Sequence, residues 1–116
     1  SWKAKPFEAV IDMHGSQPYS RVEVGYISNK PSQIFNPVAL SVCTSDDGLS
    51  WTEVVSVSIP AEGEFDPDGL KSTSVSFAET SARYMKVKAE CLSNVPAWHH
   101  YPGRQAWLYI DEIVVE

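Results

Sequence analysis

The chain has 116 residues, of which 43% are hydrophobic and 21% charged, a composition typical of one globular domain that excludes a disordered chain. Its formal net charge is -6, and Lys and Arg form no cluster, so phosphate backbones and anionic lipid headgroups would be repelled. No apolar run reaches the roughly 20 residues that a membrane span needs. The sequence therefore predicts that neither nucleic acid nor a membrane is the partner.

Apolar side chains alternate with polar ones along most of the chain, and this period of two predicts β-strands. Gly15 and Pro18 indicate a turn after the first strand, and Asp46-Asp47-Gly48 indicates a hairpin because glycine tolerates a positive φ. The acidic stretch 60–69 is typical of an exposed loop. The expected strands are 7–13, 21–26, 38 to the hairpin turn, 51–59, 72–77, 83–91 and 107–115.

About seven strands without a helix predict an all-β fold in which two antiparallel sheets pack as a β-sandwich, with one domain over 1–116. The loops 28–37 and 93–103 are longer than hairpins need and carry aromatic, amide and histidine side chains. Function in sandwiches commonly lies on such loops because the sheets hold them in place. The strand count is compatible with both loops at the same end. Cys43 and Cys91 are either two free thiols or one disulfide.

Four segments, in order and covering nearly the whole chain, resemble one family. Ser45-Asp-Asp-Gly-Leu-Ser-Trp51 is similar to its S-x-D-G-x-x-W hairpin, and Ala82-Arg-Tyr-Met-Lys-Val87 is similar to its A-R-Y-x-x-V strand. The opening segment, which is 7–13 followed after a turn by 20–24, and the ending 96–113 complete the resemblance to the discoidin domain, also called the coagulation factor five/eight C-type domain. The ending is of the kind found at the C-terminus of bacterial β-hexosaminidases (chitobiases).

This resemblance implies a galactose-binding-like jelly roll that serves as a non-catalytic carbohydrate-binding module of a glycoside hydrolase, such as a β-N-acetylhexosaminidase. It implies galactose or N-acetylhexosamine glycans and the catalytic domain of the parent enzyme as partners. It further implies a monomer that is secreted, periplasmic or on the surface of a bacterial cell. The alternative is a structural or protein-interaction domain that packs against a catalytic domain and binds no sugar.

Two departures from the family limit what the resemblance implies. Family members commonly begin with a further segment whose acidic loop helps to bind a structural calcium ion, and we expect part of that segment to be missing here. Glu112 is then a weak calcium candidate, and we expect no other cofactor. Galactose-specific members carry an Arg and an Asn-Gly in the loop 28–37, and this chain carries neither, so galactose specificity does not follow.

A sugar site needs an aromatic ring that stacks on the C–H face of a pyranose and planar polar groups that bind its hydroxyls. Trp98 lies in a polar loop outside any strand pattern, so its indole is the expected stacking surface, unless it folds back to close the sandwich end. His99 and His100 adjoin it and offer imidazole donors and acceptors, unless they bond only to the loop backbone. Tyr101 and Arg104 are further candidates.

The loop 28–37 supplies the remaining candidates. Asn29 and Gln33 offer amide groups and Phe35 an apolar surface, although Asn beside Pro more often serves turn chemistry. The expected carbohydrate-binding residues are therefore Asn29, Gln33, Phe35, Trp98, His99, His100, Tyr101 and Arg104.

Glycoside hydrolysis would need two carboxylates across a cleft. The pairs Asp46/Asp47 and Asp66/Asp68 stand in turn-like loops without an aromatic cleft and are interpreted as solvated turn residues. Because no nucleophile motif or phosphate-binding loop is present, the sequence predicts that this domain is not an enzyme.

Overall fold

The computed structural model describes residues 7–60, 63–92, 96–98 and 108–116, apart from the side chain of Ser16. Within these ranges the chain is all-β. The elements are β1 (Phe7–Ser28), the short 3-10 helix η1 (Lys30–Ser32), β2 (Ala39–Ser45), β3 (Thr52–Ser58), β4 (Gly69–Glu90) and β5 (Ile110–Val115). Neighbouring strands pair antiparallel in the order β3-β2-β4-β1-β5.

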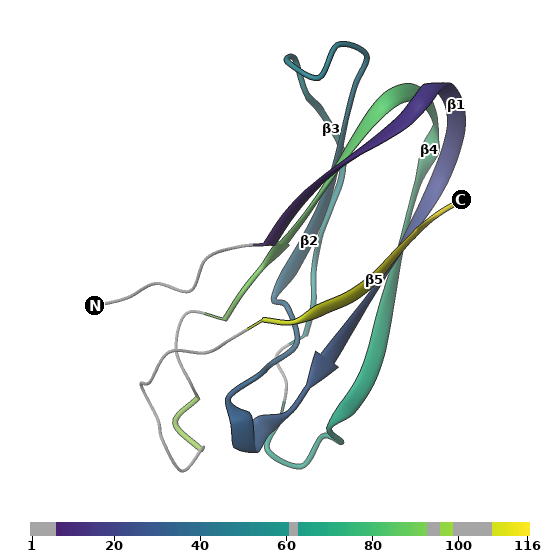
Figure 1. The fold of residues 1–116 in the computed structure, drawn as a ribbon. Coiled ribbons are helices and arrows are strands. Elements are labelled where there is room, and N and C mark those ends of the chain that lie inside the picture. The colour runs from purple at the N-terminus through teal and green to yellow at the C-terminus, as the bar shows by residue number, and fades with distance from the viewer. Residues whose placement is uncertain (1–6, 61–62, 93–95, 99–107) are drawn as a thin grey trace.

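The two layers of the sandwich come from a single sheet that folds over itself (Figure 1). β1 and β4 are 22 residues each and stay paired along both halves, while they bend together at the end that also holds the β2–β3 hairpin. Register shifts between Asp12 and Gln17 and between Tyr19 and Arg21 mark the bend. β2 pairs with the second half of β4, and β5 pairs with the second half of β1, so the two halves belong to different layers.

The turn predicted at Gly15 and Pro18 is wrong as a strand boundary, because β1 continues through it. His14 has a φ of 61° and Gly15 a φ of 154°, and the ladder to β4 resumes at Gln17 opposite Ala82. Pro and Gly are tolerated at such bulges, where ladder hydrogen bonds are interrupted. The break expected between 72–77 and 83–91 is likewise a bend inside β4. The strands expected at 7–13 and 21–26 are therefore one long strand, β1, and those expected at 72–77 and 83–91 are one long strand, β4.

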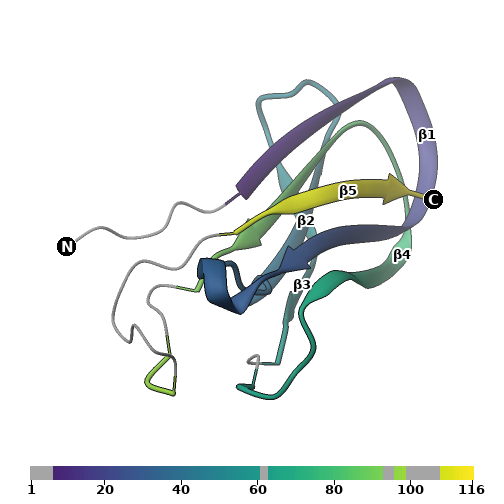
Figure 2. The same cartoon turned by 60° about the horizontal axis from the view of Figure 1, so that its bottom comes forward.

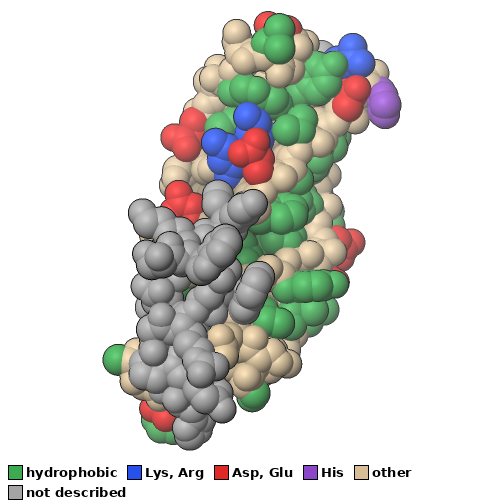
Figure 3. All heavy atoms as spheres, turned by 60° about the vertical axis from the view of Figure 1, so that its left-hand side comes forward, with side chains coloured by type: hydrophobic (Ala, Val, Ile, Leu, Met, Phe, Trp, Pro, Cys, Tyr) green, Lys and Arg blue, Asp and Glu red, His purple; other side chains and the backbone are tan. Residues whose placement is uncertain are grey.

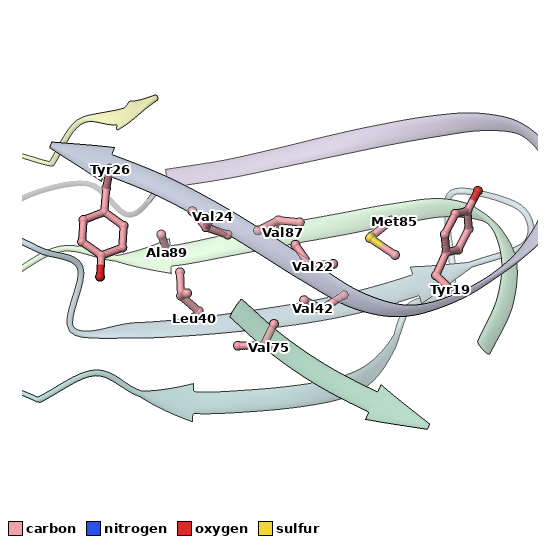
Figure 4. Close-up of a cluster of buried hydrophobic side chains, with 10 residues drawn as sticks. All are labelled: Tyr19, Val22, Val24, Tyr26, Leu40, Val42, Val75, Met85, Val87 and Ala89. Carbon is pink, nitrogen blue, oxygen red and sulfur yellow. The ribbon is translucent and has the colours of Figure 1, made fainter. Parts of the chain in front are cut away.

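The inward side chains are largely those that the alternation predicts. Val22 and Val24 of β1 face Leu40, Val42 and Val87 across the layers, and all five are buried (Figure 4). Each such burial stabilises the fold by about 1.5–3 kcal/mol. The remaining buried members of this cluster are Tyr19, Tyr26, Val75, Met85 and Ala89.

Neither Cys43 nor Cys91 forms a disulfide, so the disulfide alternative is wrong. Each is half-buried, and burial raises the pKa of the Cys91 thiol. Among the residues that the structure describes, no helix is long and apolar enough to cross a membrane.

Candidate functional site

The described parts of the two long loops meet at the end of the sandwich opposite the bend of β1 and β4 (Figures 1 and 2). Phe35 from the first loop and Trp98 from the second pack edge to face, with ring centroids 6.2 Å apart and an interplanar angle of 71°. The two loops therefore lie at the same end, as the strand count allowed. His99, His100, Tyr101 and Arg104 lie outside the described residues, and their roles stay predictions.

Phe35 does not offer the open apolar surface that we expected. Its side chain is 1% exposed and forms a small second core with Leu92 and Trp98. Trp98 itself is half-buried, so its indole is braced on Phe35 and still keeps part of its surface in solvent. This geometry lies between the two alternatives for Trp98, an open platform and a closing plug.

The helix η1 fixes the backbone of the first loop. Asn29 caps it, because its side-chain oxygen accepts a hydrogen bond from the Ser32 N–H at 3.3 Å, which is the turn chemistry considered as the alternative role for Asn29. The backbones of Asn29 and Ile34 exchange two hydrogen bonds of 2.8 and 3.0 Å. Gln33 closes η1 with a left-handed φ of 62° and donates its N–H to the Lys30 carbonyl at 3.0 Å. The loop is therefore held in one conformation by its own hydrogen bonds.

An ion pair between the buried Lys30 and the exposed Asp68 joins η1 to the acidic loop before β4. Lys30 is 8% exposed, and its Nζ donates to Asp68 Oδ1 at 2.8 Å and to the backbone carbonyl of Asp66. The same carboxylate oxygen accepts from the Lys30 N–H at 3.1 Å and from the Ser28 hydroxyl at 3.3 Å. The hydrogen bond from Lys30, despite some opposing desolvation, holds the pKa of Asp68 below its ordinary value.

Asp68 is solvent-exposed as we expected, with a side chain 41% exposed, but it also forms an ion pair with Lys30 that the sequence analysis missed. Its partner stands 38 residues away in the chain, and no periodicity or motif connects the two. The only feature of the sequence that pointed to this ion pair was a lysine among amide side chains in a Pro-containing loop. Asp47, by contrast, is the turn residue that we predicted, since its carboxylate accepts the N–H groups of Leu49 and Ser50 at 2.8 and 2.9 Å.

The loop that Lys30 holds also presents an aromatic side chain that the sequence analysis missed. Gly63 donates its N–H to Asp66 Oδ2 at 2.7 Å and accepts from the Asp66 N–H at 3.1 Å, which closes a tight turn. Phe65 lies inside this turn and is 92% exposed. The turn lies beside η1 at the same end of the sandwich as the segment 96–98 (Figures 1 and 2).

Glu112 stays an untested calcium candidate, and the described residues around it supply no cluster of metal ligands. Calcium takes six to eight oxygen ligands, but no group of three or more His, Cys, Asp or Glu residues within reach of one metal ion occurs among the described residues. Glu112 is exposed on β5 beside a hollow of about 350 Å³ that Glu23, Lys71 and Asp111 also line.

These features define an antiparallel β-sandwich in which loops with aromatic and polar side chains gather at one end of a two-layered sheet. No protein-family model and no curated protein matches the chain. Solved structures match it over most of its length. One is a rhamnosidase from Novosphingobium sp. PP1Y, with a TM-score of 0.56 and 15% identity over 94% of this chain and 8% of that one.

Two further matches are close to this chain in size. The module CpGH89CBM32-5 from Clostridium perfringens, solved in complex with GalNAc-β-1,3-galactose, has a TM-score of 0.54 and 15% identity over 93% of this chain and 67% of that one. The C-terminal domain of a chitobiase from Bacteroides fragilis has a TM-score of 0.51 and 16% identity over 97% of this chain and 66% of that one. The chain therefore spans about two thirds of these modules. It has the fold of carbohydrate-binding modules of glycoside hydrolases, and the resemblance to discoidin and chitobiase C-terminal domains is confirmed at the level of fold.

Proposed function

We propose that this chain is a non-catalytic carbohydrate-binding module of a secreted glycoside hydrolase and that Trp98 stacks on a pyranose ring of its ligand. The observation that carries the proposal is the half-buried Trp98, whose ring is braced edge-on by the buried ring of Phe35 at the loop end. A braced ring loses little conformational entropy when a sugar binds, which favours affinity for a small polar ligand.

The same loops supply polar groups that can bind the sugar hydroxyls. Gln33 lies at the end of η1, with its backbone fixed by the left-handed closure, and its amide can both donate and accept. His99, His100, Tyr101 and Arg104 follow Trp98 directly in sequence, and we assign them to the same ligand. Galactose and N-acetylhexosamine glycans are the proposed class, because both present an apolar C–H face together with hydroxyls.

The role of such a module is to keep its parent enzyme near the substrate. Tethering turns encounter with a polymer into an intramolecular event and raises the effective concentration of the catalytic domain there. Modest affinity for one sugar is then sufficient.

The proposal is tested by NMR titration of the labelled chain with galactose, N-acetylglucosamine, N-acetylgalactosamine and GalNAc-β-1,3-galactose. We expect one or more of them to shift resonances in 28–37 and 93–104 and to leave those of the β2–β3 hairpin unchanged. Trp98→Ala should lower the affinity about tenfold or more, and Trp98→Phe should retain part of it because a ring remains. Shifts with none of the four sugars, in a chain that is folded by its spectrum, would favour the packing domain without sugar.

A further inference from the structure

Phe65 is the most exposed large hydrophobic side chain among the described residues, at 92%. A single exposed apolar residue needs no explanation on a flexible loop. Phe65 differs because the backbone around it is fixed on both sides. The turn is closed by two hydrogen bonds between Gly63 and Asp66, and Lys30 binds the Asp66 carbonyl and the Asp68 carboxylate.

This arrangement couples Phe65 to the candidate site. Lys30 belongs to η1, and the loop that begins with η1 also supplies Phe35, the ring that braces Trp98. Figure 1 shows η1 between the turn that carries Phe65 and the segment 96–98, and Figure 2 shows η1 set back from the line that joins these two segments. Two partly or fully exposed aromatic rings are therefore held on either side of one hydrogen-bonded loop. Both are anchored to that loop, Trp98 by ring packing and the turn of Phe65 by the buried ammonium.

We propose that Phe65 is a second aromatic subsite for the same ligand, so that the module binds an oligosaccharide chain across η1. Trp98 stacks on one sugar ring and Phe65 on another further along the chain. This inference rests on the proposed function and adds to it that the ligand is a glycan chain rather than a single terminal sugar. Phenylalanine suits the role because it offers a large apolar area with only two side-chain torsions to fix.

The charge around Phe65 narrows the class of glycan. Glu64, Asp66 and Asp68 surround it in sequence, and the whole chain carries a net charge of -6. Carboxylates of uronic-acid polymers and anionic lipid headgroups would be repelled at this surface. The ligand is therefore a neutral glycan or one with free amino groups.

The test compares a single sugar with a chain of the same sugar by NMR titration. The probes are N-acetylglucosamine with its β-1,4 tetramer and galactose with its β-1,4 tetramer. The variants are Phe65→Ala and Phe65→Trp, and the matched control is Leu49→Ala. Leu49 is 84% exposed and lies in the β2–β3 hairpin at the far end of the molecule.

We expect the wild-type chain to bind a tetramer more tightly than its monomer. Phe65→Ala should weaken binding of the tetramer about three- to tenfold, the size of one aromatic contact, and leave binding of the monomer unchanged. Phe65→Trp should keep the tetramer affinity, and Leu49→Ala should change neither.

Three results would overturn the second subsite. If Phe65→Ala leaves the tetramer affinity unchanged, or weakens monomer and tetramer equally, Phe65 is no subsite and the site at Trp98 still stands. If the wild-type chain binds no sugar of either length, both proposals fall. If Phe65→Ala instead abolishes binding to phosphatidylserine vesicles and leaves the tetramer affinity intact, Phe65 is a membrane anchor.

Discussion

Lys30 is the most demanding single side chain of the loop end, because an ammonium group at 8% exposure must be compensated. The compensation includes the Asp68 carboxylate and the Asp66 backbone carbonyl. Removing one partner of a buried charge costs more than the pair contributes, since the remaining charge stays buried. The ion pair is therefore a point at which stability and the shape of the candidate site depend on the same contacts.

We expect Asp68→Asn to lower the free energy of unfolding by about 1–2 kcal/mol, because Lys30 loses the negative charge of Asp68. The expected loss of stability is small for a buried lysine because the Asp68 side chain is 41% exposed and water screens the ion pair. Urea denaturation at neutral pH measures it. Asp46→Asn is the control, since Asp46 is an exposed residue of the β2–β3 hairpin. Equal stability of the two variants would contradict the role assigned to the ion pair.

The effect of Asp68→Asn on the free energy of unfolding should depend on pH. The pKa of Asp68 is lower in the folded chain than its ordinary value, so its contribution is complete above the unfolded pKa. It is lost as the pH falls from about 4 through the lower folded pKa. The stability difference between the wild type and Asp68→Asn should therefore be constant at neutral pH and shrink in acid. A stability difference between wild type and Asp68→Asn that grows in acid would contradict this prediction.

At the scale of elements, the β2–β3 hairpin shows what local chemistry can predict. Asp47-Gly48 indicated the turn, and Gly48 has a φ of 76° while Asp47 accepts the N–H groups that follow it. We expect Gly48→Ala to destabilise the fold by about 1–2 kcal/mol, because a Cβ is strained at this φ. Space is not the obstacle, since an added Cβ would meet the Tyr84 ring at 3.6 Å, an ordinary contact.

Gly25→Ala is the control for this backbone argument. Gly25 lies in β1 without a positive φ, and an added Cβ would also meet its neighbours, atoms of Glu112, at 3.6 Å. It should therefore be neutral or slightly stabilising, since alanine has less freedom to lose from the unfolded chain. Thermal melts of both variants make the comparison. A larger loss for Gly25→Ala would mean that packing, not φ, decides.

Elements that depend on distant pairing were harder to predict. The alternation of Val22, Val24 and Val87 gave the inward faces correctly, because period-two patterning is a property of each strand alone. The bend at Gly15 was interpreted as a turn, because glycine and proline mark both turns and sheet corners. Only the ladder to β4 distinguishes them.

The same distinction between local pattern and long-range contact applies to the candidate site. Trp98 could be singled out from its place in a polar loop, but the burial of Phe35 could not, because it depends on which loops meet. Lys30 and Asp68 are joined only in the folded chain, so neither residue type nor spacing could connect them. Phe65 was passed over because its acidic neighbours indicated an ordinary solvated loop.

At the scale of the whole molecule, the net charge of -6 can be compared with how charged side chains lie on one face. On the face shown in Figure 3, acidic side chains are scattered along the molecule, and acidic and basic groups lie next to each other. Glu8 is such a case, with Lys86 at 3.7 Å and Lys88 at 4.0 Å. Such ion pairs do not change the net charge of -6. The resulting negative potential attracts cationic ligands and repels anionic ones.

This potential predicts how salt changes binding at the loop end. We expect a glucosamine tetramer to bind more weakly as the ionic strength rises, because screening removes its attraction to the acidic chain. A galacturonate tetramer should bind poorly at low salt and gain affinity as its repulsion is screened, while the neutral N-acetylglucosamine tetramer, as the control, changes little. Titrations at about 0.01 and 0.15 M salt span Debye lengths of roughly 30 and 8 Å and should separate the three. A galacturonate chain that binds most tightly at low salt would show instead that a local cationic group, and not the net charge, selects the ligand.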